Sequence, residues 1–425
     1  MSAQLAVNGG DPVVPEPLGK PWPIFGALEE RRLHEVLTSG QWWRGGYADD
    51  GESRVGQFEA AFARFQDADH AVAVTNGTAA LECALRAVGI GAGDEVLVPA
   101  ATFVASATAV LLVNAVPVIV DVDPRNYTIA PAAAAAAITS RTRAIVAVDY
   151  GGMPCDMEAL NALGRRHDLA IVSDCAHSHG SQWQGVGTGA LGDVGAFSFQ
   201  MGKTLTTGEG GMVLTNDVAL AEHAYSYHHI GRVRGRRFDE FHVPATNLRM
   251  TEWQGAMGLA QLTRLAAQTA VRERNAIYLA DRLAGIPGVA PLWRDPRVTR
   301  WGFYFWHFKF LPEHWNGGTC AQFRRALDAE GIPCGTGHTQ PLYQHPLFAG
   351  QVEDGGTGQP SAAPEPARAV DFRRMDCPET ERIYATEACS LQHRLFLGPR
   401  GDMDRVLAAI HKLWANQDEL RQVAV

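Results

Sequence analysis

The stretch Phe197–Gly211, FSFQMGKTLTTGEGG, decides the fold and suggests the chemistry. Lys203 lies between an apolar run, VGAFSF, and the glycine-rich turn TGEGG, and a further apolar run, MVLTN, follows. Two short apolar runs separated by a turn predict two buried strands joined by a loop. An amine beside the end of such a strand can reach a buried aldehyde, as a Schiff-base lysine must. The alternative for a lysine beside a loop is an ordinary solvated side chain.

An acidic residue ends another apolar run earlier in the chain. This run, LAIVSD, closes with Asp174. A carboxylate at a strand terminus is the usual partner for the ring nitrogen of pyridoxal phosphate (PLP). The alternative for Asp174 is to cap a helix-like stretch that follows it. Because Asp174 and Lys203 both flank apolar runs in an ordered pattern, the pair predicts a PLP site.

Composition and charge bound the class of protein. The chain has 425 residues, of which 46% are hydrophobic and 20% charged, which is enough for a large core and more than one domain. A net charge of −9 argues against nucleic acid as a partner, since phosphate binding needs a basic face. The basic run Arg232–Phe238, RVRGRRF, is a local exception that suits an anionic small molecule or a subunit contact.

The cysteines and the apolar segments indicate a reducing, soluble setting. Seven cysteines are scattered without a CxxC pair, which favours free thiols in a cytoplasmic protein over a disulfide framework. The first residues lack the basic and apolar regions of a signal peptide. The longest apolar stretch is broken by Asn114 and Pro117, so we expect no membrane span.

Strand-like and helix-like segments alternate along the first two thirds of the chain. The strand-like runs are HAVAVT, EVLVP, VPVIVDV, AIVAVD, LAIVSD, VGAFSF and GMVLTN, and the helical segments are Leu28–Gly40, Gly77–Ile90, Phe103–Val113, Pro131–Thr139 and Asp156–His167. Apolar runs of this length separated by helices predict an α/β fold with a mostly parallel central sheet covered on both faces.

The order of segments also predicts three parts. Residues 1–28 form an N-terminal arm, and residues 29–285 form a large PLP-binding domain. That domain includes a long linking helix, whose pattern runs from Asn247 to about Leu283. Residues 286–425 form a smaller C-terminal α+β domain, in which Gln351–Arg368 is predicted to be an exposed low-complexity loop.

Further candidates for the site follow the same strands. Gly77 and Thr78 open a helix, where backbone N–H groups can hold a phosphate, and an ordinary helix cap at Asn76 or Thr78 is an equal alternative. Ser198 lies on the strand before Lys203 and can offer a hydroxyl to the same phosphate. Phe103 can cover one face of a planar cofactor or be a core aromatic.

His177 lies in DCAHSHG, about one helical turn beyond Asp174, and can touch the same ring. Metal binding by His177 and His179 is disfavoured because the sequence offers no matching set of ligands.

Three motifs together resemble one family of enzymes. SDCAHSHG, FSFQMGKTLTTGEGG and ATNLRMTEWQGA, in this order, resemble the DegT/DnrJ/EryC1/StrS family of PLP-dependent aminotransferases, over about Pro21 to Ala409. The resemblance implies the fold type I, aspartate-aminotransferase-like architecture. It also implies a homodimer with each active site at the subunit interface.

The resemblance assigns roles to the central residues. Lys203 matches the lysine that carries PLP as an internal aldimine, and Asp174 matches the partner of the pyridinium nitrogen. His177 stands where the family has histidine or glutamine beside the cofactor. Phe103 matches the aromatic residue that stacks on the ring.

It also assigns the phosphate and carboxylate contacts. Gly77, Thr78 and Ser198 match phosphate contacts, and Asn247 matches the asparagine that reaches the phosphate from the neighbouring subunit. Arg249 is a candidate for holding the carboxylate of the amino donor.

The resemblance implies an aminotransferase that moves an amino group from L-glutamine or L-glutamate to a ketone of a cyclitol or sugar, in aminoglycoside or aminocyclitol antibiotic biosynthesis. Lys203 would then act as general base and acid. QWWR and HHIGRVRGRRFDEFH resemble 3-amino-5-hydroxybenzoate synthase, a dehydratase and aromatase, whereas LAVNGGDPV and PLYQHPLF resemble scyllo-inosose aminotransferases. Asp149–Gly152 resembles the nucleotide-ketosugar branch. The acceptor therefore stays open, and so does a non-catalytic PLP-binding protein.

The substrate pocket is predicted from the loops. We expect it to include Trp42, Trp43 and Arg44, together with parts of Arg232–Arg237 and His338–His345. Aromatic and arginine side chains suit a polyhydroxylated ring and an anionic ring equally well.

Overall fold

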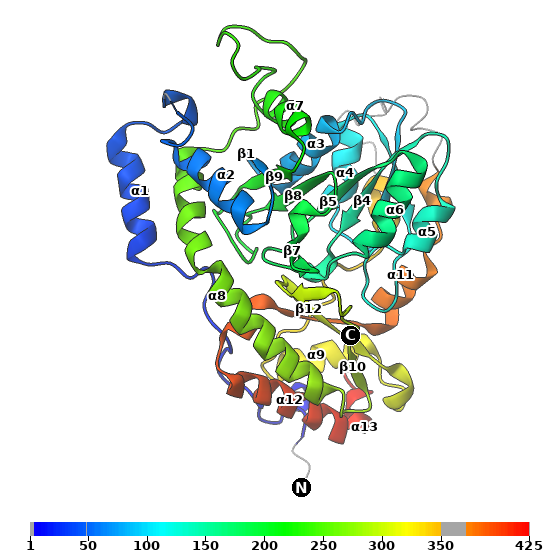
Figure 1. The fold of residues 1–425 in the computed structure, drawn as a ribbon. Helices are drawn as coiled ribbons and strands as arrows, with labels where there is room; N and C mark the ends of the chain where they lie inside the picture. The colour runs from blue at the N-terminus through cyan, green and yellow to red at the C-terminus, as the bar shows by residue number, and fades with distance from the viewer. Residues whose placement is uncertain (1–3, 48, 350–370, 425) are drawn as a thin grey trace.

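A seven-stranded sheet forms the centre of the larger part of the molecule (Figure 1). The structure is a computed structural model and describes residues 4–47, 49–349 and 371–424. The strand order is β1 (His70–Val74), β9 (Gly211–Thr215), β8 (Val194–Ser198), β5 (Ala170–Asp174), β4 (Thr142–Val148), β2 (Glu95–Pro99) and β3 (Val116–Val120). Of these seven strands, β9 alone runs against the others. The predicted mostly parallel sheet is confirmed.

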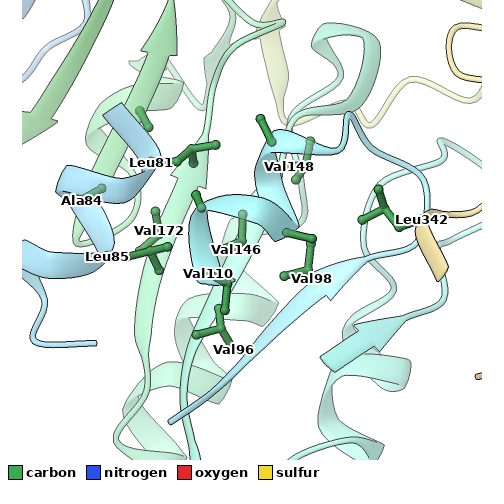
Figure 2. Close-up of a cluster of buried hydrophobic side chains, with 14 of the residues drawn as sticks. Leu81, Ala84, Leu85, Val96, Val98, Val110, Val146, Val148, Val172 and Leu342 are labelled. Atoms are coloured by element: carbon green, nitrogen blue, oxygen red, sulfur yellow. The ribbon is translucent and has the colours of Figure 1, made fainter. Parts of the chain in front are cut away.

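Helices cover both faces of this sheet because its strands are apolar on both sides. In β4, Val146 and Val148 join one buried cluster with α3 (Gly77–Ala87) and α4 (Ala105–Leu112), as Figure 2 shows. Ile145 and Ala147, which point the other way, join a second cluster with α5 (Pro131–Ala136) and α6 (Met157–His167). This alternation follows from the two-residue period of a strand. Fully burying one valine contributes about 1.5–3 kcal/mol, so the two clusters together anchor the sheet.

The predicted helices are confirmed to within a few residues at their ends, and polar caps fix several of them. Asn76, Asp156 and Asp217 accept hydrogen bonds from backbone N–H groups in the first turns of α3, α6 and α7 (Val218–His228). Such caps satisfy N–H groups that have no partner within a helix. No helix follows Asp174, since residues 175–180 form turns, so the helix-capping alternative for this residue is wrong.

A 32-residue helix, α8 (Glu252–Leu283), links the sheet to the C-terminal part of the chain, as the long green ribbon in Figure 1 shows. The first half of α8 packs against α1 (Ala27–Ser39) and α2 (Arg54–Phe65), and its Leu265 belongs to the buried cluster that includes α2. The second half contributes Leu279 and Leu283 to the C-terminal core. The predicted linking helix therefore begins at Glu252, five residues beyond Asn247.

The C-terminal part has its own sheet and core. Its three strands lie in the order β10 (Val289–Pro291), β12 (Phe305–Phe310) and β13 (Ala388–Gln392). Its helices are α9 (Cys320–Ala329), α10 (Pro346–Ala349), α11 (Pro378–Arg382), α12 (Arg400–Ala415) and α13 (Gln417–Leu420). A further small sheet pairs β11 (Val298–Arg300) with β6 (Gln182–Trp183), which pairs with β7 (Val186–Gly187). The predicted loop Gln351–Arg368 lies outside the described residues.

The N-terminal arm belongs to this C-terminal core. Leu5 and Val14 are buried within it, and Glu330 accepts hydrogen bonds from the N–H groups of Ala6 (2.9 Å) and Val13 (3.0 Å). The arm then passes to α1, which packs on α8. The division at residues 28 and 285 stays a prediction.

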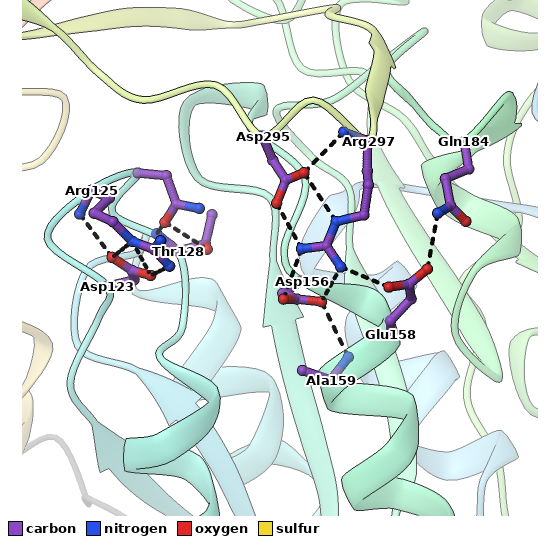
Figure 3. Close-up of polar contacts among 10 residues, drawn as sticks. Asp123, Arg125, Thr128, Asp156, Glu158, Ala159, Gln184, Asp295 and Arg297 are labelled. Carbon is purple, nitrogen blue, oxygen red and sulfur yellow. Dashed lines mark hydrogen bonds and ion pairs between the residues drawn. The ribbon is translucent and has the colours of Figure 1, made fainter.

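An ion-pair network joins the C-terminal part to the sheet domain (Figure 3). Arg297 pairs with Asp295 (2.7 Å) beside it, and with Asp156 (2.9 Å) and Glu158 (2.7 Å) at the start of α6. Asp156 also caps α6 by accepting from Ala159 N–H. One guanidinium therefore ties the connection after α8 to the start of a sheet-covering helix.

Candidate active site

A cavity of about 840 Å³ lies at the carboxyl ends of the parallel strands. Ligands of open α/β sheets bind at this edge, and the volume lies within the ~300–1,000 Å³ typical of ligand pockets. Most of its lining residues come from the ends of the central strands, the start of α3, the β8–β9 connection and the start of β12, while Leu248 and His338 come from other connections. The lining residues include Asn76, Gly77, Thr78, Thr102, Phe103, Asp174, His177, Ser198, Gln200, Lys203, Glu209, Leu248, Tyr304, Phe305 and His338.

Lys203 lies in the connection between β8 and β9, as the sequence predicts, and lines the cavity. Burial lowers the pKa of its amine to about 8, while the nearby carboxylate of Asp174 opposes this shift. The face of the Tyr304 ring lies 4.4 Å from Nζ. An amine with this pKa exchanges protons readily near neutral pH, which suits a nucleophile and proton carrier.

Asp174 ends β5 and is buried. Its carboxylate accepts hydrogen bonds from the Ser106 hydroxyl (2.7 Å) and the Ala176 N–H (3.2 Å). Burial raises the pKa of Asp174, whereas these hydrogen bonds and the Lys203 charge lower it. A buried carboxylate of this kind is stabilised by a cation placed beside it, and a protonated ring nitrogen is such a cation.

His177 is buried and its tautomer is set by a backbone contact. The Gly151 N–H donates to Nδ1 (3.3 Å), so the proton of the neutral ring resides on Nε2. Burial, followed by the charge of Lys203, holds the pKa of His177 well below its usual value. Its ring centroid lies 4.8 Å from that of Tyr304. His177 is therefore a neutral hydrogen-bond donor at the wall of the cavity.

The start of α3 and the end of β8 form a cradle of backbone N–H groups and hydroxyls. By helix geometry, the first N–H groups of α3, at Gly77 and Thr78, have no partner within the helix. A Cβ at Gly77 would lie 2.5 Å from Cβ and 2.9 Å from Oγ of Ser198, so only glycine allows this close approach. The cradle suits a phosphate, whose charge the helix N-terminus stabilises. Asn76 caps the helix, which leaves the Thr78 side chain in the cavity lining.

Phe103 is 54% exposed and lines the cavity, so the core-aromatic alternative is wrong. Its ring centroid lies 5.7 Å from that of His338. An exposed ring beside a cavity can cover one face of a planar ligand.

Taken together, these groups fit PLP. Lys203 provides an amine for the aldehyde of PLP. Asp174 provides a buried acid for its ring nitrogen, and His177 provides a hydrogen-bond donor for an oxygen of the ring. The cradle at Gly77 and Ser198 fits the phosphate, and a Cβ at position 77 would close that cradle.

Arg44 does not reach the cavity. It is buried, pairs with Glu59 through both terminal nitrogens (2.7 and 3.1 Å), and pairs with Asp50 (2.9 Å). Glu59 in turn accepts from the Ala73 N–H of β1 (2.7 Å). The guanidinium is therefore occupied by acids of its own chain, which disagrees with the prediction that Arg44 contacts the substrate.

Trp43, Arg249 and Asn247 all lie outside the cavity lining. The Arg249 guanidinium lies 5.8 Å from the Trp43 ring, and the Trp43 ring lies 6.3 Å from that of Phe238 in the basic segment. Asn247 is exposed and pairs with His229 in an isolated β-bridge.

Leu248, which lies between Asn247 and Arg249, lines the cavity. Backbone bridges at both neighbours show that this segment is extended. Successive side chains in extended backbone point to opposite sides. Asn247 and Arg249 therefore point away from the cavity of their own chain. Neither these two residues nor Trp42 and Trp43 are among its lining residues.

The structure adds residues that the sequence pattern did not single out. Ser106, the second residue of α4, donates to Asp174 without lining the cavity itself, whereas Tyr304 lines the cavity and covers Lys203. His338 lies within a predicted segment, but His345 is absent from the cavity lining. Glu209, in the TGEGG turn, also lines the cavity. A polar residue in an apolar helix was the one available signal for Ser106.

The cysteines form no disulfide, and neither they nor the histidines gather into a metal-binding group among the described residues. All seven cysteines are free thiols, and six are buried. Among residues 4–47, 49–349 and 371–424, no group of three or more histidine, cysteine or acidic side chains could hold a metal ion. His179 bonds through Nε2 to the Ser198 carbonyl (2.8 Å). No helix in the same ranges has the length and apolarity needed to cross a membrane.

The fold and this site define a fold type I PLP-dependent transferase. The DegT/DnrJ/EryC1/StrS aminotransferase family matches residues 24–397, and the chain belongs to this family.

The relatives cover nearly the whole chain. An L-glutamine:scyllo-inosose aminotransferase from Streptomyces griseus is 36% identical, over 99% of this chain and all of the relative. A 3-amino-5-hydroxybenzoate synthase from Amycolatopsis mediterranei is 37% identical, over 88% of this chain and 92% of the relative. A crystal structure of 3-amino-5-hydroxybenzoic acid synthase superimposes with a TM-score of 0.80 and 34% identity, over 95% of this chain and 99% of that one. The protein is an aminotransferase.

Proposed function

We propose that this aminotransferase uses PLP to move an amino group from L-glutamine or L-glutamate to a ketone of a cyclitol or sugar, in aminocyclitol antibiotic biosynthesis. The observation that carries the proposal is the cavity that brings Lys203, Asp174 and His177 together beside the phosphate cradle. The scyllo-inosose aminotransferase, similar from end to end, supports a ketocyclitol as acceptor and glutamine as donor.

The residues divide the work. When bound, PLP supplies an electron sink that allows the proton on the donor's α-carbon to leave. Asp174 holds a proton on the ring nitrogen, and His177 donates from Nε2 to an oxygen of the ring. We propose that Lys203 binds the cofactor covalently and, once displaced, carries the proton on Nζ. Its pKa of about 8 leaves a sizeable fraction of the amine neutral just above neutral pH.

We also propose a homodimer in which each cavity is completed by the neighbouring subunit. Asn247 and Arg249 point away from their own cavity. Arg249 lies beside the exposed Trp43 (38%), which in turn contacts the exposed Phe238 (61%). In a dimer, Asn247 would reach the phosphate of the other subunit, and Arg249 the carboxylate of the donor. The free thiols support a cytoplasmic location.

Nitrogen transfer tests the reaction. The purified protein, loaded with PLP, is given glutamine labelled with ¹⁵N at the α-amino group and each of three acceptors: a ketocyclitol, a nucleotide ketosugar and a carboxylated keto ring. We expect the label in the amine of the ketocyclitol and its loss in Lys203→Ala. Loss of water without nitrogen transfer would instead support the 3-amino-5-hydroxybenzoate synthase-like reaction, which the second relative favours.

Mixing two inactive variants tests the shared site. Lys203→Ala and Asn247→Asp each disable a cavity, the second by placing a negative charge near the phosphate. If Asn247 acts on the neighbouring cavity, one cavity of each hybrid dimer is intact, and the mixture regains about a quarter of the wild-type activity. No recovery after subunit exchange would place Asn247 in its own subunit's site.

A further inference from the structure

Lys203 needs a place for its amine whenever that amine is not covalently engaged. Among the described residues, Nζ makes no ion pair or side-chain hydrogen bond, and the charge of Asp174 acts on it only from a longer distance. The face of the Tyr304 ring lies 4.4 Å away, well inside the ~6 Å range of a cation–π contact.

The Tyr304 ring is held in this position from several sides. The backbone N–H of Tyr304 donates to the Gly151 carbonyl (3.0 Å), and the backbone carbonyl of Tyr304 accepts from the His393 N–H (3.2 Å). The ring packs against Phe305 (4.2 Å between centroids) and His177 (4.8 Å). These contacts fix the ring directly before β12.

The hydroxyl of Tyr304 contributes differently from the ring. A Cβ at Gly202 would lie 2.9 Å from the Tyr304 Oη, so the phenol end lies over the backbone just before Lys203. Burial is the cause that raises the pKa of this hydroxyl, with no hydrogen bond from another described residue contributing. The contact with the amine is made by the ring face, over which Nζ lies.

We propose that Tyr304 is a positioning residue whose ring face holds the Lys203 ammonium at the wall of the cavity when the amine is free. The proposal rests on the proposed role of Lys203. The ring gives the displaced amine a defined position between the two halves of transamination, within reach of the cofactor. Because a ring face attracts the charged form, Tyr304 also opposes the effect of burial on this amine.

Graded fluorination of the ring tests the proposal without changing its shape. Phenylalanine and its mono-, di- and trifluoro derivatives are placed at position 304 of the full-length, cofactor-free protein. The pH dependence of Lys203 acetylation, followed by mass spectrometry, then gives the pKa of the amine. Phenylalanine should leave this pKa near the wild-type value of about 8.

Fluorine withdraws electrons from the ring face, so the pKa should fall stepwise, by about half a unit to one unit for the trifluoro ring. The same series at Phe305, which lines the cavity but does not cover the amine, is the matched control and should leave the pKa unchanged.

A flat response at position 304, or an equal response at position 305, would overturn the proposal. So would a pKa that changes already with phenylalanine, since that result would assign the effect to the hydroxyl. Because the measurement needs neither cofactor nor substrate, it distinguishes a failure of this proposal from a failure of the proposed reaction. Tyr304→Leu, checked for folding by circular dichroism, should slow PLP capture, whereas Tyr304→Phe should not.

Discussion

The charged form of Asp174 is stabilised by the hydroxyl of Ser106, which the hydroxyl of Thr102 holds in place. Burial raises its pKa, and the hydrogen bond from Ser106 is the largest effect in the opposite direction. Ser106 is buried and is also 2.8 Å from the Thr102 hydroxyl, so it cannot turn away freely. The hydroxyl therefore keeps the carboxylate charged for the ring nitrogen.

Replacing Ser106 should make the enzyme more sensitive to acid. Removing this donor raises the pKa of Asp174, so Asp174 becomes protonated, and activity is lost, at a higher pH than in the wild type. A hydrogen bond to a charged group is worth about 1.5–3 kcal/mol, so kcat of Ser106→Ala should fall about tenfold or more on the acid side. The pH profile of kcat measures the shift.

Thr108→Ala is the control for this experiment. Thr108 lies on the same helix, and its hydroxyl bonds to the Ala105 carbonyl instead of Asp174. Its profile should match the wild type. An unshifted acid limb in Ser106→Ala would contradict the assigned role.

At the residue scale, sequence reasoning finds side chains that end strands and misses those that approach from elsewhere. Lys203 and Asp174 can be identified because apolar runs mark the sheet edge where parallel strands deliver their ends. Ser106 reaches Asp174 through the packing of α4, and Tyr304 reaches the cavity from the C-terminal part of the chain. Those approaches depend on tertiary contacts that no local pattern encodes.

The contact between α3 and β8 is the element-scale feature that shapes the phosphate cradle. In Gly77→Ala the new Cβ would meet Ser198 at 2.5 Å and push the helix N-terminus from the strand end. Overpacking of this kind costs about 1–3 kcal/mol, so PLP should bind about 10- to 100-fold more weakly. Titration of the cofactor-free protein with PLP, followed by tryptophan fluorescence, measures the loss.

A glycine in open surroundings provides the comparison. A Cβ added at Gly91, shortly after α3, would have only the Arg86 Nη1 within 4 Å, at 3.9 Å. Gly91→Ala should keep the wild-type PLP affinity. Equal affinity in both variants would show that the cradle does not hold the phosphate.

Arg44 connects the loop after α1 to α2 and β1, and its substitution should affect stability more than substrate binding. Removing Arg44 leaves Glu59 buried without its partner, which costs about 3–5 kcal/mol. Urea unfolding should show this loss in Arg44→Ala, while the KM for the acceptor stays within about twofold of the wild type.

The partly exposed pair of Arg32 and Glu35 on α1 is the matched control. The two side chains are 32% and 35% exposed, so Arg32→Ala should change the stability by less than about 1 kcal/mol. If Arg44→Ala instead raised the KM for the acceptor strongly and left the stability unchanged, the predicted substrate contact of Arg44 would be supported.

At the element scale, the helices and strands of the sheet domain are predictable from the sequence because each follows an apolar run with a clear cap or turn. The order of strands in the sheet is not predictable in this way, since β1 lies at one edge next to β9, far from it in the chain. The substrate loops also mislead: an arginine beside two tryptophans has the composition of a binding loop, and only packing shows that Glu59 already occupies it.

At the scale of the whole molecule, Glu330 contacts segments from both ends of the chain. Its buried carboxylate accepts from the N–H groups of Ala6 and Val13 in the arm and pairs with Lys412 of α12 (2.9 Å). Glu330→Ala should lower the stability by about 3 kcal/mol and release the arm, because a buried ion pair and two hydrogen bonds are lost. Proteinase K digestion followed by mass spectrometry should then show early cleavage within residues 4–20.

Glu313, at the surface of the same part of the molecule and 65% exposed in its side chain, offers a control substitution to alanine. In Glu313→Ala, the N-terminal arm should stay as protected from Proteinase K as it is in the wild type. Continued protection of the arm in Glu330→Ala would mean that Leu5 and Val14 hold it through apolar packing alone.

The docked arm also has a consequence for the order in which the protein is made. The Leu5 N–H donates to Glu419 (3.0 Å), so a segment that leaves the ribosome early bonds to one that leaves it late. Until α13 has been synthesised, the arm lacks Glu419, and Glu330 emerges only after the strands of the central sheet are complete. The newborn chain therefore carries the arm unattached through most of translation, and the C-terminal core closes only once α12 and α13 have emerged.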